Sequence, residues 1–242
     1  MPLFSHTGNC PICETERTFT AEHEWFRDHL ICSGCGSIPR ERALFKVLHD
    51  YYPNYESLAI HETSPCGRGA SVKLQRQCEG YSTSQYLPDS EPGAINAAGI
   101  RNENLEAMTF ADESFDLFIS QDVMEHVFNP EQAFAEIARV LKPGGAHIFT
   151  VPMINKNKMT QRCAAINNEG EIEHFKEPEY HANPVDPKGS LVTMHWGYDI
   201  ASYIQSKAGM PTIIHQIDNI DLGIRGEYSD VVVSLKHPVS HY

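Results

Sequence analysis

The 242-residue sequence lacks any long apolar run: nowhere do about 18 apolar residues follow one another, as a membrane-spanning helix requires. Residues 1–13 show neither the basic start nor the apolar stretch of an export signal. Basic residues are also scarce, with 19 Lys and Arg against 32 Asp and Glu and a net charge of −13. A surface of that sign repels polyanions. We therefore expect a cytoplasmic protein with neither membrane nor nucleic acid as its partner.

Repeats and low-complexity segments are absent too. Apolar residues make up 41% and charged residues 21%, an ordinary globular composition that excludes collagen-like and wholly disordered chains. The length predicts one large domain with a small appendage.

Seven cysteines, an odd number without an export signal, argue against a disulfide framework. Four of them form two Cys-x-x-Cys pairs separated by 18 residues: Cys10, Cys13, Cys32 and Cys35. This spacing is typical of a zinc ribbon, where four thiolates complete a closed tetrahedral shell. We predict a structural zinc ion in a ribbon over residues 1–38; redox thiols and an iron–sulfur cluster are the alternatives. Cys66, Cys78 and Cys163 have no matched spacing and are expected to be free thiols.

An amphipathic pattern after Pro39 predicts a helix within residues 39–55 that links the ribbon to the main domain. Short apolar runs then alternate with helical patterns, which predicts an α/β fold with a mainly parallel sheet and helices on both faces. The expected strands are 58–61, 115–120, 147–152, 212–217 and 229–236, and the expected helices are 70–77 and 131–141.

The segments Ser-Phe-Asp-Leu-Phe-Ile-Ser-Gln-Asp-Val-Met-Glu-His, from Ser114, and Leu-Lys-Pro-Gly-Gly, from Leu141, resemble the class I S-adenosylmethionine-dependent methyltransferases. The resemblance covers residues 56–152 and, by arrangement, 211–236. It is greatest to bacterial methyltransferases of unassigned substrate that share the N-terminal four-cysteine ribbon. It implies a Rossmann-like methyltransferase domain over 56–242, with an antiparallel last strand and an insert at about 155–198 that acts as a lid.

The resemblance also implies S-adenosylmethionine as a cofactor, bound at the carboxyl ends of the strands, where open parallel sheets bind their ligands. The residues that it places there are Glu62, Ser64, Gly67, Ser84, Gln85, Asn104, Leu105, Gln121 and Asp122. Three regions depart from the family. Ser64, Cys66 and Arg68 replace glycines of the first loop, Ser84 and Gln85 stand where an acid binds the ribose, and Asn104 replaces an Asp.

Methyl transfer is an in-line displacement that needs a base only for hydroxyl-like acceptors. His126, expected at the start of a helix, and His181 of the insert are the candidate catalytic residues, and a structural role is the alternative for each. His181 with His174 and Asp186 could also bind a second metal ion.

The favoured function is methyl transfer to a small-molecule or carbohydrate-like acceptor, through a hydroxyl. One alternative is a zinc-ribbon RNA methyltransferase in which Arg27, Arg40 and Arg42 bind phosphates, although the net charge opposes it. The other is a noncatalytic scaffold, suggested by the altered glycine loop.

Overall fold

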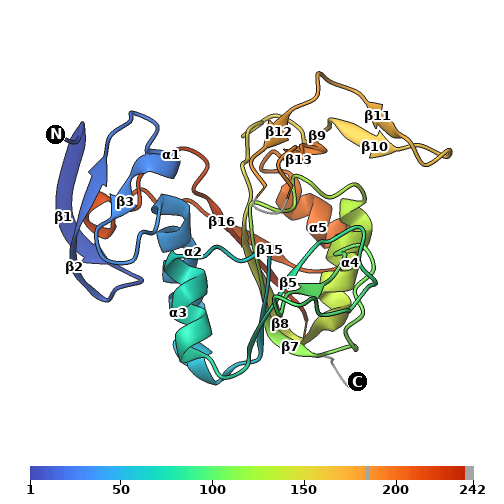
Figure 1. The fold of residues 1–242 in the computed structure, drawn as a ribbon, viewed down its shortest axis with the longest axis horizontal. Helices are drawn as coiled ribbons and strands as arrows, with labels where there is room; N and C mark the ends of the chain where they lie inside the picture. The colour runs from blue at the N-terminus through green and yellow to red at the C-terminus, as the bar shows by residue number, and fades with distance from the viewer. Residues whose placement is uncertain (184–185, 238–242) are drawn as a thin grey trace.

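The structure is a computed structural model that describes residues 1–183 and 186–237 (Figure 1). Residues 184–185 of the expected insert and 238–242 of the expected main domain lie outside the described residues. The centre is a seven-stranded sheet with the order β15-β16-β8-β7-β4-β5-β6. In chain order, its strands are β4 (Ile60–Thr63), β5 (Tyr81–Gln85), β6 (Arg101–Asn102), β7 (Phe115–Gln121), β8 (Leu141–Thr150), β15 (Thr212–His215) and β16 (Val231–Leu235).

Strand direction follows the pattern expected of a Rossmann-like methyltransferase sheet. The pairs β4–β5, β4–β7, β5–β6 and β7–β8 are parallel. β16, the last strand in the chain, is antiparallel to both of its neighbours, β8 and β15. The prediction of a mainly parallel sheet with an antiparallel last strand is confirmed.

Helices cover both faces of this sheet (Figure 1). α2 (Pro39–Tyr51) and α3 (Gly69–Gln77) lie on one face, and α4 (Pro130–Val140) and α5 (Ile200–Ala208) on the other. Each face of the sheet has its own hydrophobic core, and alternate side chains of β7 belong to one or the other. Leu117 packs in the core on the α2 side, and Phe118 packs in the core that contains Phe134 of α4. The longest helix in the described part, α2, has 13 residues, and none there is long and apolar enough to cross a membrane.

Some boundaries differ from those expected. β4 begins two residues later, at Ile60, and β8 begins at Leu141, so it includes the Pro-Gly-Gly segment. The expectation that His126 starts a helix is wrong. α4 begins at Pro130, because Asn129 accepts a hydrogen bond from Gln132 N (3.2 Å) as the N-cap and the proline suits the first turn. His126 instead lies in the turn between β7 and α4.

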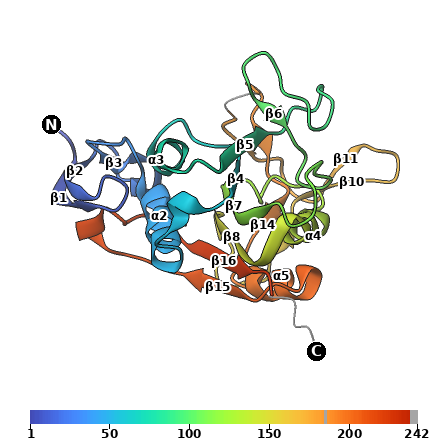
Figure 2. The ribbon, with the colours of Figure 1, turned by 90° about the horizontal axis from the view of Figure 1, so that it is seen from below.

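A separate three-stranded antiparallel sheet forms the N-terminal end of the molecule (Figure 2). It consists of β1 (Phe4–Cys10), β2 (Thr15–Ala21) and β3 (Ile31–Cys32), with the short helix α1 (Phe26–His29) before β3. A segment from near the other end of the chain, η2 (Ile220–Leu222), lies beside β1. There His6 Nε2 and Asp221 Oδ1 are 2.9 Å apart. A further short helix, η1 (Tyr55–Ser57), follows α2.

Arg42 of α2 ties these parts together. Its side chain is fully buried and lies 4.8 Å from the ring centre of Phe19. The guanidinium donates to the carbonyl oxygens of Leu30 (2.7 Å), Gly223 (2.7 Å) and Ser37. One side chain thus satisfies backbone groups at the end of α1, in the turn before α2 and in the C-terminal segment. This arginine has no surface available for a phosphate.

The described residues of the insert between β8 and α5 form three small two-stranded antiparallel sheets. β9 (Gln161–Arg162) pairs with β14 (Met194–His195), β10 (Ala164–Ile166) with β11 (Ile172–His174), and β12 (Tyr180–His181) with β13 (Ser190–Leu191). Its base is anchored to the turn before α4. Thr193 N donates to Glu125 O (2.8 Å), Thr193 Oγ1 to Val127 O (2.6 Å) and Trp196 Nε1 to Met124 O (3.2 Å).

Replacing Arg42 tests this connection. In Arg42→Ala, three buried carbonyl oxygens lose the guanidinium, of which Ser37 O keeps the N–H of Cys32, and we expect the free energy of unfolding to fall by about 3 kcal/mol or more. Lys46→Ala, on the exposed part of the same helix, removes only a surface ion pair with Asp50 and should cost less than about 0.5 kcal/mol. Urea unfolding measures both. Equal effects of the two substitutions would contradict the role given to Arg42.

Candidate functional site

A cavity of about 1,100 Å³ opens at the carboxyl ends of β4, β5 and β7. It lies between the central sheet, the region of α1 and the start of α2, and the insert, all of which contribute to its lining. Small-molecule sites in proteins typically have volumes of about 300–1,000 Å³. This cavity is slightly larger, so a cofactor and an acceptor can occupy it together. The predicted site residues that line it are Ser64, Gly67, Gln85, Asn104, Leu105, Gln121, Asp122, His126 and His181.

Glu62 and Ser84 do not line the cavity. Ser84 is buried, and its hydroxyl contacts His61 Nε2 (2.9 Å) inside the sheet, because successive strand residues face opposite sides and Gln85 takes the cavity side. Burial lowers the pKa of His61 to about 3, so this imidazole is neutral. The Ser84 side chain therefore does not reach the cavity and cannot contact a ribose there.

Glu62 is a fully buried positioning residue beneath the cavity. Its carboxylate accepts hydrogen bonds from Ser71 Oγ (2.8 Å), Tyr81 OH (2.5 Å) and Gln121 Nε2 (2.8 Å). Burial raises its pKa, and these three donors oppose the shift. The bond from Gln121 orients that amide, and Gln121 Oε1 is left buried without a hydrogen-bond partner among the described residues. Gln121 lines the cavity, so this unused acceptor is available to a donor group of a ligand that reaches it.

The loop after β4 is fixed by backbone contacts. Ser64 adopts a left-handed φ of 53°, and its N–H donates to Ser84 O (2.8 Å). Gly67 faces open space, since a Cβ placed there would meet no atom within 4 Å. At Gly69 (φ 57°) a Cβ would lie 2.4 Å from Glu41 Oε2, so glycine is required where the loop packs on α2. The loop therefore keeps one exposed glycine next to the cavity.

Asn104 and Leu105 lie on the adjacent wall. Asn104 Oδ1 already accepts the N–H of Glu106 (3.0 Å), and a carbonyl oxygen can accept a second hydrogen bond. Leu105 is buried and offers an apolar surface. This pair suits the edge and the face of a planar ring.

Asp122 is held by two arginines of the N-terminal region. It follows β7 with a left-handed φ of 52°, and its Oδ2 lies 2.7 Å from Arg27 Nη2 and 2.9 Å from Arg40 Nε. Asp28 pairs with the same two arginines, at 3.3 and 2.6 Å. Burial opposes ionisation of Asp122, but the charges of Arg27 and Arg40 outweigh it and lower its pKa. Arg27 and Arg40 are thus engaged in ion pairs and do not form a free phosphate-binding surface.

The N-terminal region also lines the cavity, which the sequence did not indicate. Trp25, Arg27, Asp28 and Arg40 all contribute to its wall. Tyr228, from the C-terminal part, lies 6.2 Å from Trp25, measured between ring centres. Because these contacts join distant parts of the chain, no local spacing could reveal them.

His126 and His181 lie together, although 55 positions separate them. Their ring centres are 5.0 Å apart. His126 Nε2 and His181 Nδ1 each lie 3.7 Å from Glu125 Oε1. Interaction with Glu125 raises the pKa of His181, and Glu179 adds to the shift. Glu125 is the residue that sequence reasoning missed, although it stands in the Glu-His pair that carries the family resemblance.

The predicted second metal site with His174 and Asp186 does not form. His174 is an exposed residue of β11, and Asp186 is exposed and accepts the N–H of Lys188 (2.9 Å). Among the described residues, His181 instead groups with Glu125 and His126.

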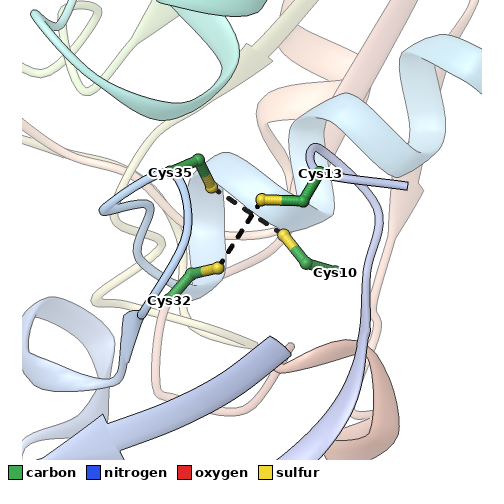
Figure 3. A group of neighbouring side chains, drawn as sticks. All are labelled: Cys10, Cys13, Cys32 and Cys35. Atoms are coloured by element: carbon green, nitrogen blue, oxygen red, sulfur yellow. Dashed lines mark hydrogen bonds between the residues drawn. The ribbon is translucent and has the colours of Figure 1, made fainter. Parts of the chain in front are cut away.

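The four cysteines of the Cys-x-x-Cys pairs point toward one another (Figure 3). Cys10 Sγ lies 3.8 Å from Cys35 Sγ, and Cys13 Sγ lies 3.8 Å from Cys32 Sγ. These distances exclude disulfides, whose sulfur atoms are about 2.05 Å apart. A tetrahedral ion with metal–sulfur bonds of about 2.3 Å has sulfur–sulfur edges of about 3.8 Å. The donor set and its spacing therefore fit a closed four-thiolate metal site.

Comparison with known proteins agrees with the sheet topology. Residues 66–149, from the loop before α3 through β8, match the family model of a methyltransferase domain. A solved S-adenosylmethionine-dependent methyltransferase from Mesorhizobium loti superimposes with a TM-score of 0.50 over 81% of this chain and 98% of its own, at 17% identity. The chain has a class I methyltransferase fold.

Curated relatives match a shorter stretch of this methyltransferase fold. A dimethylglycine N-methyltransferase of Parasynechococcus marenigrum is 41% identical over 54 residues, which is 22% of this chain and 19% of the relative. An uncharacterised methyltransferase of Mycobacterium avium is 36% identical over 72 residues, 26% of this chain and 28% of the relative. The chain thus spans less than a third of the length of these relatives.

The ion pair of Asp122 predicts a pH-dependent stability. Asp122→Asn leaves buried Arg27 without this partner and should lower the free energy of unfolding by about 3 kcal/mol at pH 7. Since the pKa of Asp122 is lowered from 3.8 on folding, the stabilisation is complete above that value and is lost as the pH falls through the folded-state pKa.

Urea unfolding of both proteins between pH 7 and pH 3.5 measures this difference. The gap between wild type and variant should be constant down to about pH 5 and begin to narrow below about pH 4, as the pH approaches the unfolded-state pKa of Asp122. Asp112→Asn, which removes an exposed ion pair with Arg139, is the control and should change stability by less than about 1 kcal/mol. A gap as wide at pH 3.5 as at pH 7 would refute the ion-pair account.

Proposed function

We propose that this protein transfers a methyl group from S-adenosylmethionine to the hydroxyl of a small-molecule acceptor. The observation that carries the proposal is the cavity at the carboxyl edge of a methyltransferase sheet, with room for two ligands, and Gln121 in its lining has a buried Oε1 without a hydrogen-bond partner among the described residues. Such an acceptor atom suits the ammonium group of the cofactor's methionine portion. The fold alone does not carry the activity.

Different residues of the cavity lining suit different parts of the cofactor. Gln121 would accept a hydrogen bond from the ammonium group, and the loop at Gly67 leaves space for close approach of the cofactor's methionine portion. Gln85 offers polar atoms for the ribose. Asn104 and Leu105 would contact the adenine edge and face. When bound, the cofactor supplies an electrophilic methyl group on a sulfonium. The fit of these groups to the cavity supports the proposal.

The acceptor side is assigned to the cluster of Glu125, His126 and His181 on the insert side. A hydroxyl must lose its proton as its oxygen attacks, and imidazoles with a nearby carboxylate are suited to that task. The walls around the cluster hold the acceptor in line, where most of the acceleration arises. The name of the Parasynechococcus relative gives dimethylglycine, a small molecule, as its acceptor, which agrees with a small substrate here. A carbohydrate-like acceptor remains part of the proposal.

An RNA acceptor is less well supported. Arg27 and Arg40 are paired with Asp28 and Asp122, and Arg42 is buried. The net charge of −13 also opposes binding of polyanions.

Calorimetric titration with S-adenosylmethionine tests the proposal. We expect binding at micromolar concentrations, and Asn104→Ala should weaken it about fivefold, the equivalent of roughly 1 kcal/mol for one hydrogen bond. Asn96→Ala, in an exposed loop away from the cavity, should bind like the wild type. Absence of heat from folded protein would favour the noncatalytic scaffold.

We further propose that Cys10, Cys13, Cys32 and Cys35 bind a structural zinc ion. Protein purified without chelator should contain one zinc ion per chain, because four thiolates form a closed site. Cys32→Ser should reduce the content to below about half and lower the unfolding temperature. Cys66→Ser removes a thiol outside the cluster and should leave both unchanged. Elemental analysis and thermal unfolding decide, and metal-free wild type of normal stability would exclude the ion.

A further inference from the structure

Glu125 has an environment that ordinary packing does not explain. It is 1% exposed, and neither of its carboxylate oxygens has a hydrogen-bond partner among the described residues. Its nearest charge partners, the imidazoles of His126 and His181, stop 3.7 Å short of Oε1, beyond hydrogen-bond distance. The turn places it there firmly, since its carbonyl oxygen accepts the N–H groups of Thr193 (2.8 Å) and Met194 (3.2 Å). A cation bound between the carboxylate and the two imidazoles would give this buried charge a partner at bonding distance.

Two imidazole nitrogens face the same oxygen. His126 Nε2 and His181 Nδ1 are each 3.7 Å from Glu125 Oε1, and the ligand atoms of the three residues lie within 4.8 Å of one another. Donors that share an ion through bonds of about 2 Å lie roughly 3–4 Å apart. The three groups therefore need little adjustment to bind one ion.

The second nitrogen of each imidazole already has a partner. His126 Nδ1 lies 2.9 Å from the carbonyl oxygen of Leu191, so it carries the proton and leaves Nε2 free as a ligand. His181 Nε2 lies 3.4 Å from Glu179 Oε1, and Glu179 Oε2 in turn contacts His195 Nε2 (3.0 Å). Metal-binding histidines in proteins commonly have this outer support from a carbonyl or a carboxylate.

From this geometry we propose that Glu125, His126 and His181 bind a divalent cation of the first transition row at the acceptor end of the cavity. Two imidazoles and one carboxylate suit such ions and leave further positions open. His126 and His181 line the cavity, so the open positions face the space for the acceptor. An acceptor with oxygen donors would complete the shell; with the ion bound, the imidazoles serve as ligands, and the ion takes over from an imidazole base the task of promoting loss of the hydroxyl proton. This last assignment rests on the proposed methyl transfer, whereas the ion site does not.

The site differs in chemistry from the four cysteines. Thiolates favour zinc and other soft ions in a closed shell, whereas imidazole and carboxylate accept a wider range and here leave room for a ligand. With a second divalent cation supplied, two ions per chain are therefore expected, zinc at the cysteines and the added ion at Glu125, His126 and His181.

Cobalt(II) binding to the zinc-loaded protein tests the proposal. In equilibrium dialysis with elemental analysis, the wild type should bind one cobalt ion per chain while keeping its zinc, and any exchange at the cysteines would show as lost zinc. His181→Ala and Glu125→Gln should each weaken cobalt binding at least about tenfold, since even outer-shell changes cost 10–100-fold. His174→Ala removes an exposed histidine of the same insert and should leave binding unchanged.

His181 is partly exposed, so its replacement should not affect folding, and thermal unfolding of each variant checks this. No cobalt beyond that replacing zinc, or equal binding by wild type and His181→Ala, would overturn the proposal. The calorimetric titration with S-adenosylmethionine is independent of this result. Cofactor binding without cobalt binding refutes only the ion site, and cobalt binding without cofactor binding refutes only the proposed function.

Discussion

The ion pairs between Asp122 and the two arginines Arg27 and Arg40 determine how the molecule is put together around its cavity. Asp122 stands at the carboxyl end of the central strand β7, in a left-handed conformation, where open α/β sheets bind their ligands. Arg27 and Arg40 come from the region around the cysteine cluster. With Asp28 they make a balanced group of two positive and two negative charges. The N-terminal module is thereby a wall of the cavity and not a detached appendage.

The insert forms the opposite wall in a different way. Its base is attached through backbone carbonyl oxygens of Met124, Glu125 and Val127 to Thr193 and Trp196. Backbone groups of the turn before α4 are thus used to hold the insert, while Val123, His126 and Val127 of that turn line the cavity. This arrangement brings a histidine from a late segment next to the Glu-His pair of the turn.

Much of the fold followed from local patterns. The two Cys-x-x-Cys pairs, the alternation of strands and helices and the Pro-Gly-Gly turn are short-range signals, and the sheet that they predict is present. The site was less accessible. The direction of Ser84 depends on strand register, and the start of α4 depends on the cap at Asn129, one residue before the proline. Asp122 is paired with Arg27, and Glu125 is held in its buried position by Thr193. Both contacts join residues more than sixty positions apart, so no local pattern in a single sequence reveals them.

The position of η2 beside β1 has a consequence for how the chain is made. The buried guanidinium of Arg42 needs Gly223 O, and Gly223 itself packs against the ring of Phe19. A ribosome adding about 5–20 residues per second reaches this glycine roughly ten to forty-five seconds after the first cysteines. During that interval, Arg42, which packs behind the N-terminal sheet, lacks the carbonyl oxygen of Gly223 as a hydrogen-bond partner. The cysteine-bearing segment is therefore translated well before the residues that complete it, and its maturation waits until the segment around Gly223 has emerged.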